Sequence, residues 1–298
     1  MNNNICFIIN PVSGTGNWKG VEENIKKYLS SSFTPIIHYT KYHGHATILA
    51  EDATENCSLI IAVGGDGIVN EVAAGMMSSS VGLGIIPAGS GNAVANHFTI
   101  PRTHKEAIEC INKTHFSTVD TALVNDTPFL AVAGTGFDAE VAALFAGSKT
   151  RGFFSYLYLS AIKYFTYKPS EYEIIVDGKM HHKKAFVISV ANSSQYGNNA
   201  YIAPQASTKD GLLDVSIIKP FTVFSSVVLL WRLFRKTLHH SPYVEIIRGK
   251  DIVIRKTKTG EKLCLHYDGE PGGMVDKIHI SVQPRSLRII TPEKHGRI

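Results

Sequence analysis

The sequence predicts an α/β domain with a mostly parallel sheet, followed by a second domain that is mainly an antiparallel β-sandwich. Three observations support this fold class. The length of 298 residues is close to two domains at about 150 residues each. From residue 5 to about 113, short apolar runs alternate with amphipathic stretches of helical length. After about Thr118 the pattern changes to strand-length runs separated by turn signals.

The first domain is expected to alternate strands and helices along the chain. Buried strands are predicted at Ile5–Asn10, Pro35–Tyr39, Leu59–Val63 and Leu83–Ile86. The remaining stretches predict helices at about 17–30, 44–55, 68–77 and 104–113. Strands separated by helices usually lie parallel. Their carboxyl ends then meet at one edge of the sheet, where open α/β sheets bind ligands.

The second domain is expected to contain short strands joined by turns such as Asp177-Gly178. These strands are Phe129–Val132, Tyr172–Val176, Ala185–Ala191, Leu213–Ile218, Val244–Ile247, Ile252–Arg255, Leu263–Tyr267, Ile278–Val282 and Leu287–Ile290. Two longer stretches, Arg151–Tyr167 and Phe221–Lys236, predict helices with apolar and aromatic residues and with Arg or Lys near their ends. The pattern favours helices packed on the sheet, and the alternative is contact with a membrane.

The composition narrows the class of protein and of partner. With 44% hydrophobic and 18% charged residues, the chain is an ordinary globular protein and not a disordered, collagen-like or coiled-coil one. The net charge of +5 suits an anionic partner such as a nucleotide, a membrane surface or a nucleic acid. The four scattered cysteines predict neither disulfides nor a zinc site. With no signal peptide and no spanning segment, the sequence predicts a cytoplasmic protein with an option of peripheral membrane association.

Glycine-containing loops follow each of the first four predicted strands, at 10–16, 40–44, 64–67 and 87–92. Glycine lets the backbone approach a phosphate closely, and a helix that begins after the loop adds the positive end of its dipole. Neither the Walker A nor the G-x-G-x-x-G pattern is present. In the third loop, Asp66 lies among three glycines and is followed by Asn70 and Glu71. This arrangement favours a phosphate-linked or metal-linked function over a plain turn.

These loops resemble those of the diacylglycerol kinase catalytic domain family, which includes bacterial lipid kinases and sphingosine and ceramide kinases. The resemblance covers nearly the whole chain. It rests on the segments Asn10–Gly14, Gly64–Gly67 with Asn70-Glu71, Pro87–Asn92, Gly136–Ala139, Ile202–Pro204, Asp210–Asp214 and Asp268–Glu270. It implies an NAD kinase/diacylglycerol kinase-like fold, in which an ATP-binding α/β domain spans 1–118, with 285–298 returning to it. A β-sandwich domain for the lipid substrate would span 119–284, with the active site between the two domains.

The implied reaction transfers the γ-phosphoryl group of ATP to a hydroxyl of a lipid, either diacylglycerol or a sphingoid long-chain base. Glu270 matches the family's proton acceptor, Asp268 lies beside it, and Asp66 would orient phosphate-bound Mg²⁺ or the acceptor hydroxyl, so these three are the predicted catalytic residues. From the residues alone, Asp268-Gly269 is also a favoured turn pair, but a turn does not explain Glu270. By resemblance, the nucleotide-binding residues are Asn10, Pro11, Val12, Ser13, Gly14, Thr40, Gly64, Gly65, Asp66, Gly67, Ile68, Val69, Asn70, Glu71, Gly89, Ser90 and Asn92.

A second Mg²⁺ site is implied at Asp210, with the main-chain oxygens of Ser207 and Leu212. A plain Asp-Gly turn explains Asp210 equally well. Asp138 and Glu140 are the predicted substrate residues, because sphingosine-type members carry an acid at the position of Glu140 that can pair with an amino-alcohol head group. A solvated glutamate at the start of a helix is the alternative.

The sequence departs from the family's common pattern at three places. Ile68 stands where threonine is frequent, the turn Gly89–Ala93 is closer to the sphingosine kinase form than to Gly-Thr-x-Asn-Asp, and Asn198-Asn199 replaces glycines. We therefore keep two alternatives: an NAD kinase, which shares the Gly-Gly-Asp-Gly loop, and a catalytically idle paralogue that binds lipid or nucleotide. The expected partners are ATP and a lipid substrate at a membrane surface, which account for the net charge without a nucleic acid. A homodimer is one option for the assembly.

Overall fold

The computed structural model describes residues 3–12, 18–77, 79–148 and 153–293. Of residues 153–157 it describes the backbone alone. The chain forms two compact units. Unit 1 contains Met1–Asp120 and Arg285–Ile298, and unit 2 contains Thr121–Pro284. The roles that the sequence assigns to its predicted domains, nucleotide for the first and lipid for the second, stay predictions.

Unit 1 is an α/β unit with parallel strands. Its strands are β1 (Asn4–Ile9), β2 (Thr34–Tyr39), β3 (Leu59–Gly64) and β4 (Gly82–Pro87), in the order β2-β1-β3-β4. All neighbouring strands in this order are parallel. Nearly every residue of β1, β3 and β4 is buried, as expected of strands that are covered on both faces. The α/β prediction is confirmed for this unit.

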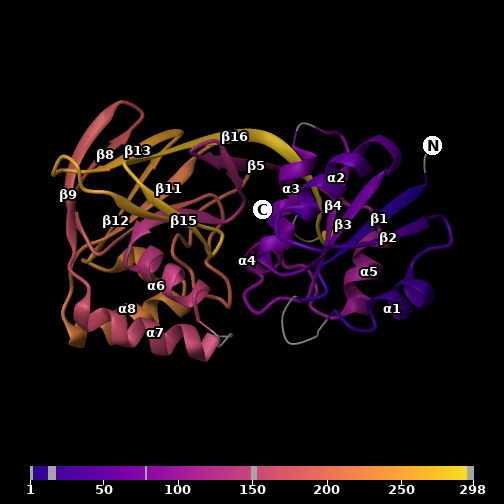
Figure 1. The fold of residues 1–298 in the computed structure, drawn as a ribbon, viewed down its shortest axis with the longest axis horizontal. Coiled ribbons are helices and arrows are strands. Elements are labelled where there is room, and N and C mark those ends of the chain that lie inside the picture. Colours follow the sequence, from indigo (N-terminus) through magenta and orange to yellow (C-terminus); the bar gives the residue numbers. More distant parts are fainter. Residues whose placement is uncertain (1–2, 13–17, 78, 149–152, 294–298) are drawn as a thin grey trace. The chain divides into compact units, whose positions relative to one another are not determined.

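Helices cover both faces of this sheet (Figure 1). They are α1 (Val21–Tyr28), α2 (His45–Asn56), α3 (Asp66–Met76), α4 (Ala93–His97) and α5 (His104–Asn112). Helix α1 packs against α5 on one face, and α2 packs against α3 on the other. The core on the first face joins side chains of β1 and β3 with those of α1 and α5. The short helix α4 was not predicted, because its five residues are too few to show a period.

Unit 2 contains two antiparallel layers. One is a six-stranded sheet in the order β12-β11-β10-β7-β14-β15, and the other contains β16, β13, β8 and β9, with β5 and β6 beside them. The strands are β5 (Phe116–Val124), β6 (Thr127–Phe129), β7 (Val132–Gly136), β8 (Ser170–Val176), β9 (Lys179–Ala185), β10 (Val187–Ala191), β11 (Leu213–Ile218), β12 (Val244–Gly249), β13 (Asp251–Lys256), β14 (Leu263–Tyr267), β15 (Glu270–Val275) and β16 (Lys277–Ile290). Apolar side chains of both layers form one buried cluster. The predicted antiparallel sandwich is confirmed.

Several strands differ from the sequence prediction. The predicted strand Phe129–Val132 is instead the end of β6 and the start of β7. Strands β9 and β15 were missed because their sequences, KMHHKKA and EPGGMV, are polar or rich in glycine. They form because each is the second arm of a hairpin, closed by Asp177-Gly178 and by Asp268-Gly269. Backbone hydrogen bonds to the first strand of each hairpin, β8 and β14, therefore make these segments strands.

The long strand β16 belongs to both units. Its residues from Lys277 to Ser281 pair with β13 in unit 2, whereas Arg288 and Ile289 pair with β4 in unit 1 and lie parallel to it. The sequence shows this stretch as two separate strands. The crossing was implied by the family resemblance alone.

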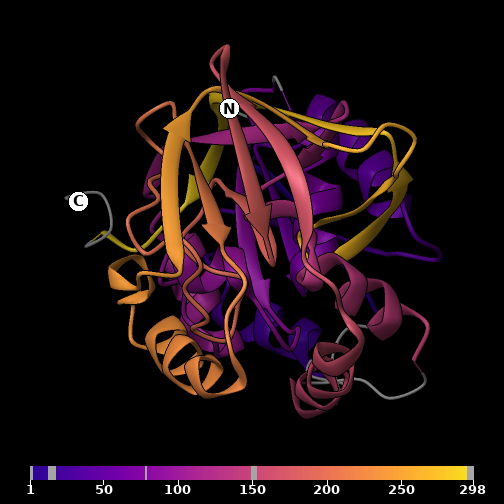
Figure 2. The same ribbon diagram turned by 90° about the vertical axis from the view of Figure 1, so that its left-hand side faces the viewer.

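The described residues of unit 2 also form three helices: α6 (Phe137–Ala146), α7 (Phe153–Thr166) and α8 (Val223–Phe234), with the short 3-10 helix η1 (Leu238–His240) after α8. Figures 1 and 2 show α6, α7 and α8 at the same end of the unit. Helix α6 packs against β7, β14 and β15. In the described part of the chain, no helix has both the length and the apolar character needed to cross a bilayer.

Candidate functional site

The predicted nucleotide loops of unit 1 begin at one edge of its sheet. The N–H of Asn10 donates to the carbonyl of Val63 at 3.1 Å, and the N–H of Thr40 donates to that of Ile9 at 2.9 Å. The strand ladder thus extends into the first residue of each loop. Because the strands are parallel, the loops after β1, β2, β3 and β4 all leave from the same edge. Such an edge is where open α/β sheets bind ligands.

The first loop begins with a local turn. The Oδ1 atom of Asn10 accepts the N–H of Val12 at 3.0 Å. The side chain of Val12 is 84% exposed, so it makes no part of the core. Ser13 and Gly14, which the resemblance assigns to the nucleotide, lie outside the described residues.

The third and fourth loops touch each other backbone to backbone. A Cβ atom added at Gly89 would lie 2.3 Å from the Cα atom of Gly65, which is closer than real Cβ contacts. The fourth loop is also fixed from within, since Asn92 accepts the N–H of Gly89 at 3.1 Å and donates to its carbonyl at 2.8 Å. These glycines are therefore required by close packing of the two loops, whether or not a phosphate binds there.

Asp66 is the first residue of α3, directly after Gly65. Its Oδ1 atom accepts the N–H of Val94 at 3.3 Å, and its side chain stays partly exposed. Its Oδ2 atom lies 3.0 Å from where a Cβ of Gly91 would be, so the glycine lets the backbone of the fourth loop approach this carboxylate closely. A partly exposed carboxylate next to glycine backbone is an oxygen ligand of the kind that Mg²⁺ prefers, so Asp66 would be the residue that holds this ion.

Two other predicted nucleotide residues face the core of unit 1. Ile68 is 4% and Val69 is 2% exposed, so their side chains cannot contact a ligand and only their backbone could. The departure at Ile68 therefore removes no accessible hydroxyl. The second departure is also accommodated, because Asn198 and Asn199 have φ angles of 48° and 61°. Asparagine is among the non-glycine residues that adopt this left-handed conformation most readily.

Glu71 holds the end of the second loop against α3. Its Oε2 atom accepts the N–H of Ala46 at 3.1 Å, and its Oε1 atom lies 3.0 Å from Nδ1 of His43. Its carbonyl accepts the hydroxyl of Thr47 at 3.0 Å. Glu71 therefore has a positioning role in the structure, and its contact with nucleotide stays a prediction.

The remaining nucleotide residues leave polar groups accessible near the same edge. Ser90 is exposed, and Thr40 and Asn70 are partly exposed. Their hydroxyl and amide groups can donate to phosphate oxygens. Gly64 has a φ of 155°, and Gly67 is partly exposed in the first turn of α3.

In unit 2, Asp268 fixes the turn between β14 and β15. Its Oδ2 atom accepts the N–H of Leu130 at 2.8 Å, and its Oδ1 atom accepts those of Ala131 at 2.8 Å and Val132 at 3.0 Å. The donors belong to residues that are at most 6% exposed. This carboxylate is used to satisfy buried backbone groups, so the structure gives Asp268 a positioning role.

Glu270 differs from Asp268 although only Gly269 separates them. It is the first residue of β15 and is exposed, and its carboxylate has no hydrogen bond or ion pair within the described part of the chain. A carboxylate with free lone pairs on a turn that is held rigidly can accept a proton from a bound hydroxyl.

Asp138 lies in a buried polar cluster behind α6. Its Oδ2 atom accepts hydrogen bonds from Ser189 Oγ at 3.0 Å and Tyr196 OH at 2.8 Å, and lies 2.9 Å from His266 Nε2. Asp138 is 7% and His266 is 3% exposed. The side chain of Asp138 is thus bound by three groups of unit 2, and its contact with substrate stays a prediction. Sequence reasoning missed His266, although the residues on either side of it, Leu265 and Tyr267, face the sandwich core and place it on the opposite face.

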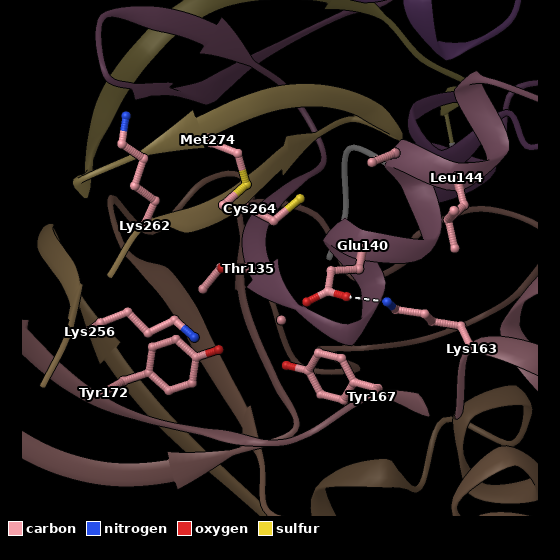
Figure 3. Close-up of a pocket in the computed structure, with 12 residues that line it drawn as sticks. Thr135, Glu140, Leu144, Lys163, Tyr167, Tyr172, Lys256, Lys262, Cys264 and Met274 are labelled. Carbon is pink, nitrogen blue, oxygen red and sulfur yellow. Dashed lines mark ion pairs between the residues drawn. The ribbon is translucent and has the colours of Figure 1, made fainter. Parts of the chain in front are cut away.

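A pocket of about 430 Å³ lies in unit 2 between α6, α7 and strands of both layers (Figure 3). Glu140 lines it and forms an ion pair with Lys163 on α7, with Oε2 and Nζ 2.6 Å apart. On another wall, Lys256 donates to Ser170 Oγ at 2.5 Å, and its ammonium lies 5.0 Å from the ring centre of Tyr172. Burial lowers the pKa of Lys256. Glu140 is thus brought into a cavity, as expected for a substrate residue, but it already has a cationic partner.

At the predicted second metal site, the place of a cation is taken by the guanidinium of Arg248. Asp210 accepts the N–H of Leu212 with Oδ1 at 3.1 Å and is bound through Oδ2 by Arg248. Arg248 also approaches Asp214, whose carboxylate is 2% exposed, at 3.4 Å. Within the described residues, no group of three metal-ligating side chains occurs, and Ser207 contributes only a partly exposed turn. The arrangement with Arg248 does not fit a Mg²⁺ ion at Asp210.

Comparisons with known proteins agree with the fold of both units. Residues 4–124 match the model of the diacylglycerol kinase catalytic domain, and residues 131–291 match that of the YegS C-terminal NAD kinase beta sandwich-like domain. A protein of Synechocystis without an assigned function is 31% identical over 97% of this chain and 70% of its own. The diacylglycerol kinase of Bacillus subtilis is 28% identical over 97% of this chain and 96% of its own. The crystal structure of a diacylglycerol kinase from Bacillus anthracis has a TM-score of 0.73 at 20% identity and covers 98% of both chains.

Proposed function

Since the chain belongs to the family of lipid kinases with a diacylglycerol kinase catalytic domain and a YegS-type C-terminal domain, we propose that it transfers the γ-phosphoryl group of ATP to a lipid hydroxyl. The observation that carries this proposal is Glu270, an exposed carboxylate that has no hydrogen bond or ion pair with the described residues and lies on a turn that Asp268 anchors. The geometry separates a group that is free to react from a neighbour that holds it in place.

The loops of unit 1 supply the nucleotide side of the reaction. Phosphoryl transfer depends mainly on positioning the phosphates and neutralising their charge. The packed backbones of Gly65 and Gly89 fix two loops, and the N-terminus of α3 adds its positive dipole end. Mg²⁺ bound beside Asp66 would neutralise phosphate oxygens, and the hydroxyl of Ser90 is free to donate to them.

Glu270 acts as the general base for the hydroxyl of the acceptor lipid. As the lipid oxygen forms its bond to the γ-phosphorus, the proton of the hydroxyl passes to the Glu270 carboxylate. The bond between the γ-phosphorus and the bridging oxygen breaks, and that oxygen leaves with ADP. The departing ADP carries the electron pair, so no further reactant is needed.

A lipid acceptor requires access to a membrane surface, and α8 offers an apolar face for it. Phe224, Val227, Val228 and Trp231 are spaced along one side of the helix and are 90%, 70%, 53% and 57% exposed. The basic residues Arg232, Arg235 and Lys236 follow at its C-terminal end. An apolar helix face followed by basic residues is typical of helices that lie on anionic membranes, so membrane contact becomes the favoured interpretation of this stretch.

The test measures ATP-dependent phosphorylation of vesicle lipids by wild type, Glu270→Gln and a control, Glu171→Gln. Glu171 is an exposed carboxylate of unit 2 whose side chain has no partner in the described part of the chain. Wild type and the control are expected to form phosphorylated lipid, and Glu270→Gln is expected to lose at least about a hundredfold in kcat. Phosphorylation of NAD instead of lipid would establish the NAD kinase alternative, and nucleotide or lipid binding without any product would establish the idle paralogue.

A further inference from the structure

A row of residues crosses three neighbouring strands of the six-stranded sheet next to α6. Ser189 on β10 and His266 on β14 both lie opposite Gly134 on β7. Residues in register on neighbouring strands point to the same face of a sheet, so two polar side chains flank a position that has none. Helix α6 packs against β7 and β14 (Figure 1), and the carboxylate of Asp138 in its first turn contacts both polar side chains.

Asp138 thereby joins several segments of unit 2. Ser189 Oγ and Tyr196 OH donate to its Oδ2 atom at 3.0 and 2.8 Å, and Nε2 of His266 lies 2.9 Å from the same oxygen. Because an ionised carboxylate only accepts hydrogen bonds, Nε2 of His266 carries the hydrogen of this contact. Asp138 and His266 are both buried, so water does not compete for their hydrogen bond.

The backbone pairing of the hairpin β14–β15 is interrupted beside His266. The register shifts between Leu265 and His266, so that Gly272 is an extra residue on β15. His266 itself lies opposite Pro271, which has no N–H to donate to its partner strand. A bulge and a proline therefore separate the end of the hairpin that carries Glu270 from its regular part.

Two side chains tie this end of the hairpin to other parts of unit 2. Asp268 accepts three backbone N–H groups of residues 130–132, which join the turn to the start of β7. His266 joins the strand before the turn to the start of α6. Glu270 lies opposite Tyr267, the residue between these two anchors. Where backbone pairing is interrupted, the position of the Glu270 carboxylate depends on both side-chain contacts.

We propose that His266 is a positioning residue for the proposed reaction, because its hydrogen bond to Asp138 fixes the strand segment that places the carboxylate of Glu270. The proposal rests on the proposed function and adds a residue that acts through Glu270 without touching the substrate. Helix α6 also carries Glu140 into the pocket of unit 2. The hydrogen bond between β14 and α6 thus fixes the general base relative to this pocket.

The test compares two amides of different length at position 266. His266→Gln can place its NH₂ group close to the position of Nε2 and keep the hydrogen bond, whereas the side chain of His266→Asn is one methylene shorter and loses it. The control is Ser216→Ala, which removes the buried hydrogen bond of 3.0 Å from β11 to the carbonyl of Ile202. If His266→Asn does not fold, His266→Phe takes its place, since it fills the space of the ring without a donor.

Initial rates of lipid phosphorylation are measured at a temperature well below the melting transition of every variant. We expect His266→Gln to keep kcat within about threefold of wild type, and His266→Asn to lower kcat at least about tenfold with an unchanged KM for ATP. Ser216→Ala should lower the Tm and leave kcat unchanged. A wild-type kcat in His266→Asn, or a loss in His266→Gln as large as in His266→Asn, overturns the proposal.

A second comparison separates positioning of Glu270 from a general loss of structure. In Glu270→Gln the base is absent, so its position no longer matters. Adding His266→Asn to this variant should lower the residual kcat by less than about twofold. A further tenfold loss overturns the proposal, because His266 would then act on turnover by another route than Glu270.

Hydrogen exchange tests the same contact without turnover. The N–H of Asp268 donates to the carbonyl of Val132 at 2.8 Å, so exchange in the peptide 266–272 reports whether the turn is held. We expect this exchange to be at least about tenfold faster in His266→Asn and unchanged in His266→Gln and Ser216→Ala.

The exchange result also separates the two proposals. If the wild type phosphorylates no lipid, the proposed function fails, and the exchange still decides whether His266 holds the turn. Unchanged exchange in His266→Asn, or equally faster exchange in every variant, overturns the role of His266. Failure of both His266→Asn and His266→Phe to fold also overturns it, because the contact with Asp138 would then serve the folding of unit 2 alone.

Discussion

The contrast between Asp268 and Glu270 gives the sharpest prediction about the candidate site. Asp268 accepts three backbone N–H groups, and Glu270 accepts none from the described residues. Substitution by the corresponding amide should therefore affect stability at one position and chemistry at the other. The two variants, Asp268→Asn and Glu270→Gln, make the same chemical change two residues apart, so each controls for the other.

The magnitude for Asp268→Asn follows from its hydrogen bonds. An asparagine can place its one carbonyl oxygen where Oδ1 accepts Ala131 and Val132, but its NH₂ group then faces the N–H of Leu130. One hydrogen bond is lost, the other two lose the charge of the acceptor, and a buried donor is left without a partner. At roughly 1–3 kcal/mol for each unsatisfied or weakened bond, we expect a loss of about 3 kcal/mol in the free energy of unfolding.

The assay is a thermal melt combined with initial rates at a temperature well below the transition. A loss of about 3 kcal/mol corresponds to a Tm lower by roughly 6–12 °C for a unit of this size. Glu270→Gln removes no hydrogen bond or ion pair with the described residues, so its Tm should stay within about 1–2 °C of wild type while kcat falls at least about a hundredfold. A Tm for Asp268→Asn equal to wild type, or a large fall in Tm for Glu270→Gln, would refute the assignment of the two roles.

Three further predictions concern other parts of the molecule. Gly89→Ala places a Cβ 2.3 Å from the facing backbone, so we expect ATP affinity to fall at least about tenfold in a nucleotide titration, whereas Gly147→Ala, with 3.7 Å of clearance, leaves it unchanged. Arg248→Met leaves the buried carboxylate of Asp214 without its cation and should cost about 2 kcal/mol of stability. Burial raises the pKa of Asp214 and Arg248 opposes this, so without Arg248 the folded state holds the proton of the Asp214 carboxyl more tightly. The urea midpoint of unfolding should therefore fall more, relative to wild type, at about pH 8 than at about pH 5. An equal fall at both pH values would contradict the pairing of Arg248 with Asp214. Phe224→Ser, at a side chain that is 90% exposed, should weaken sedimentation with anionic vesicles several-fold without changing the Tm, and unchanged sedimentation would exclude α8 as the contact.

The sequence predicts the architecture well where one physical signal dominates. The continuous apolar runs of β1, β3 and β4 are visible because parallel strands are buried on both faces. Strands β9 and β15 carry no such signal, because their sequences are polar or rich in glycine. They form strands through backbone pairing in a hairpin. The passage of β16 from β13 to β4 is hidden for a similar reason, since its pairing partners lie far away along the chain.

The roles of individual acidic residues are harder to predict than the fold, because they depend on which donors the fold brings to each carboxylate. The sequence places Asp66, Asp138, Asp210 and Asp268 in loops or at helix starts without distinguishing them. In the structure, buried backbone N–H groups occupy Asp268, a buried cluster occupies Asp138, and a guanidinium occupies Asp210. The carboxylate of Asp66 accepts the N–H of Val94, lies close to the backbone of Gly91 and stays partly exposed.

The same reasoning distinguishes the cationic side chains that have a carboxylate partner from those that have none among the described residues. A surplus of five positive charges suits many anionic partners, and composition alone does not choose among them. What distinguishes partners is whether a cation has already been neutralised by the chain: Arg248 and Lys163 have carboxylates of their own, whereas Lys256 has none within ion-pair distance in the described structure. A partly buried ammonium without a counter-ion is costly in the free protein and is relieved by an anionic ligand.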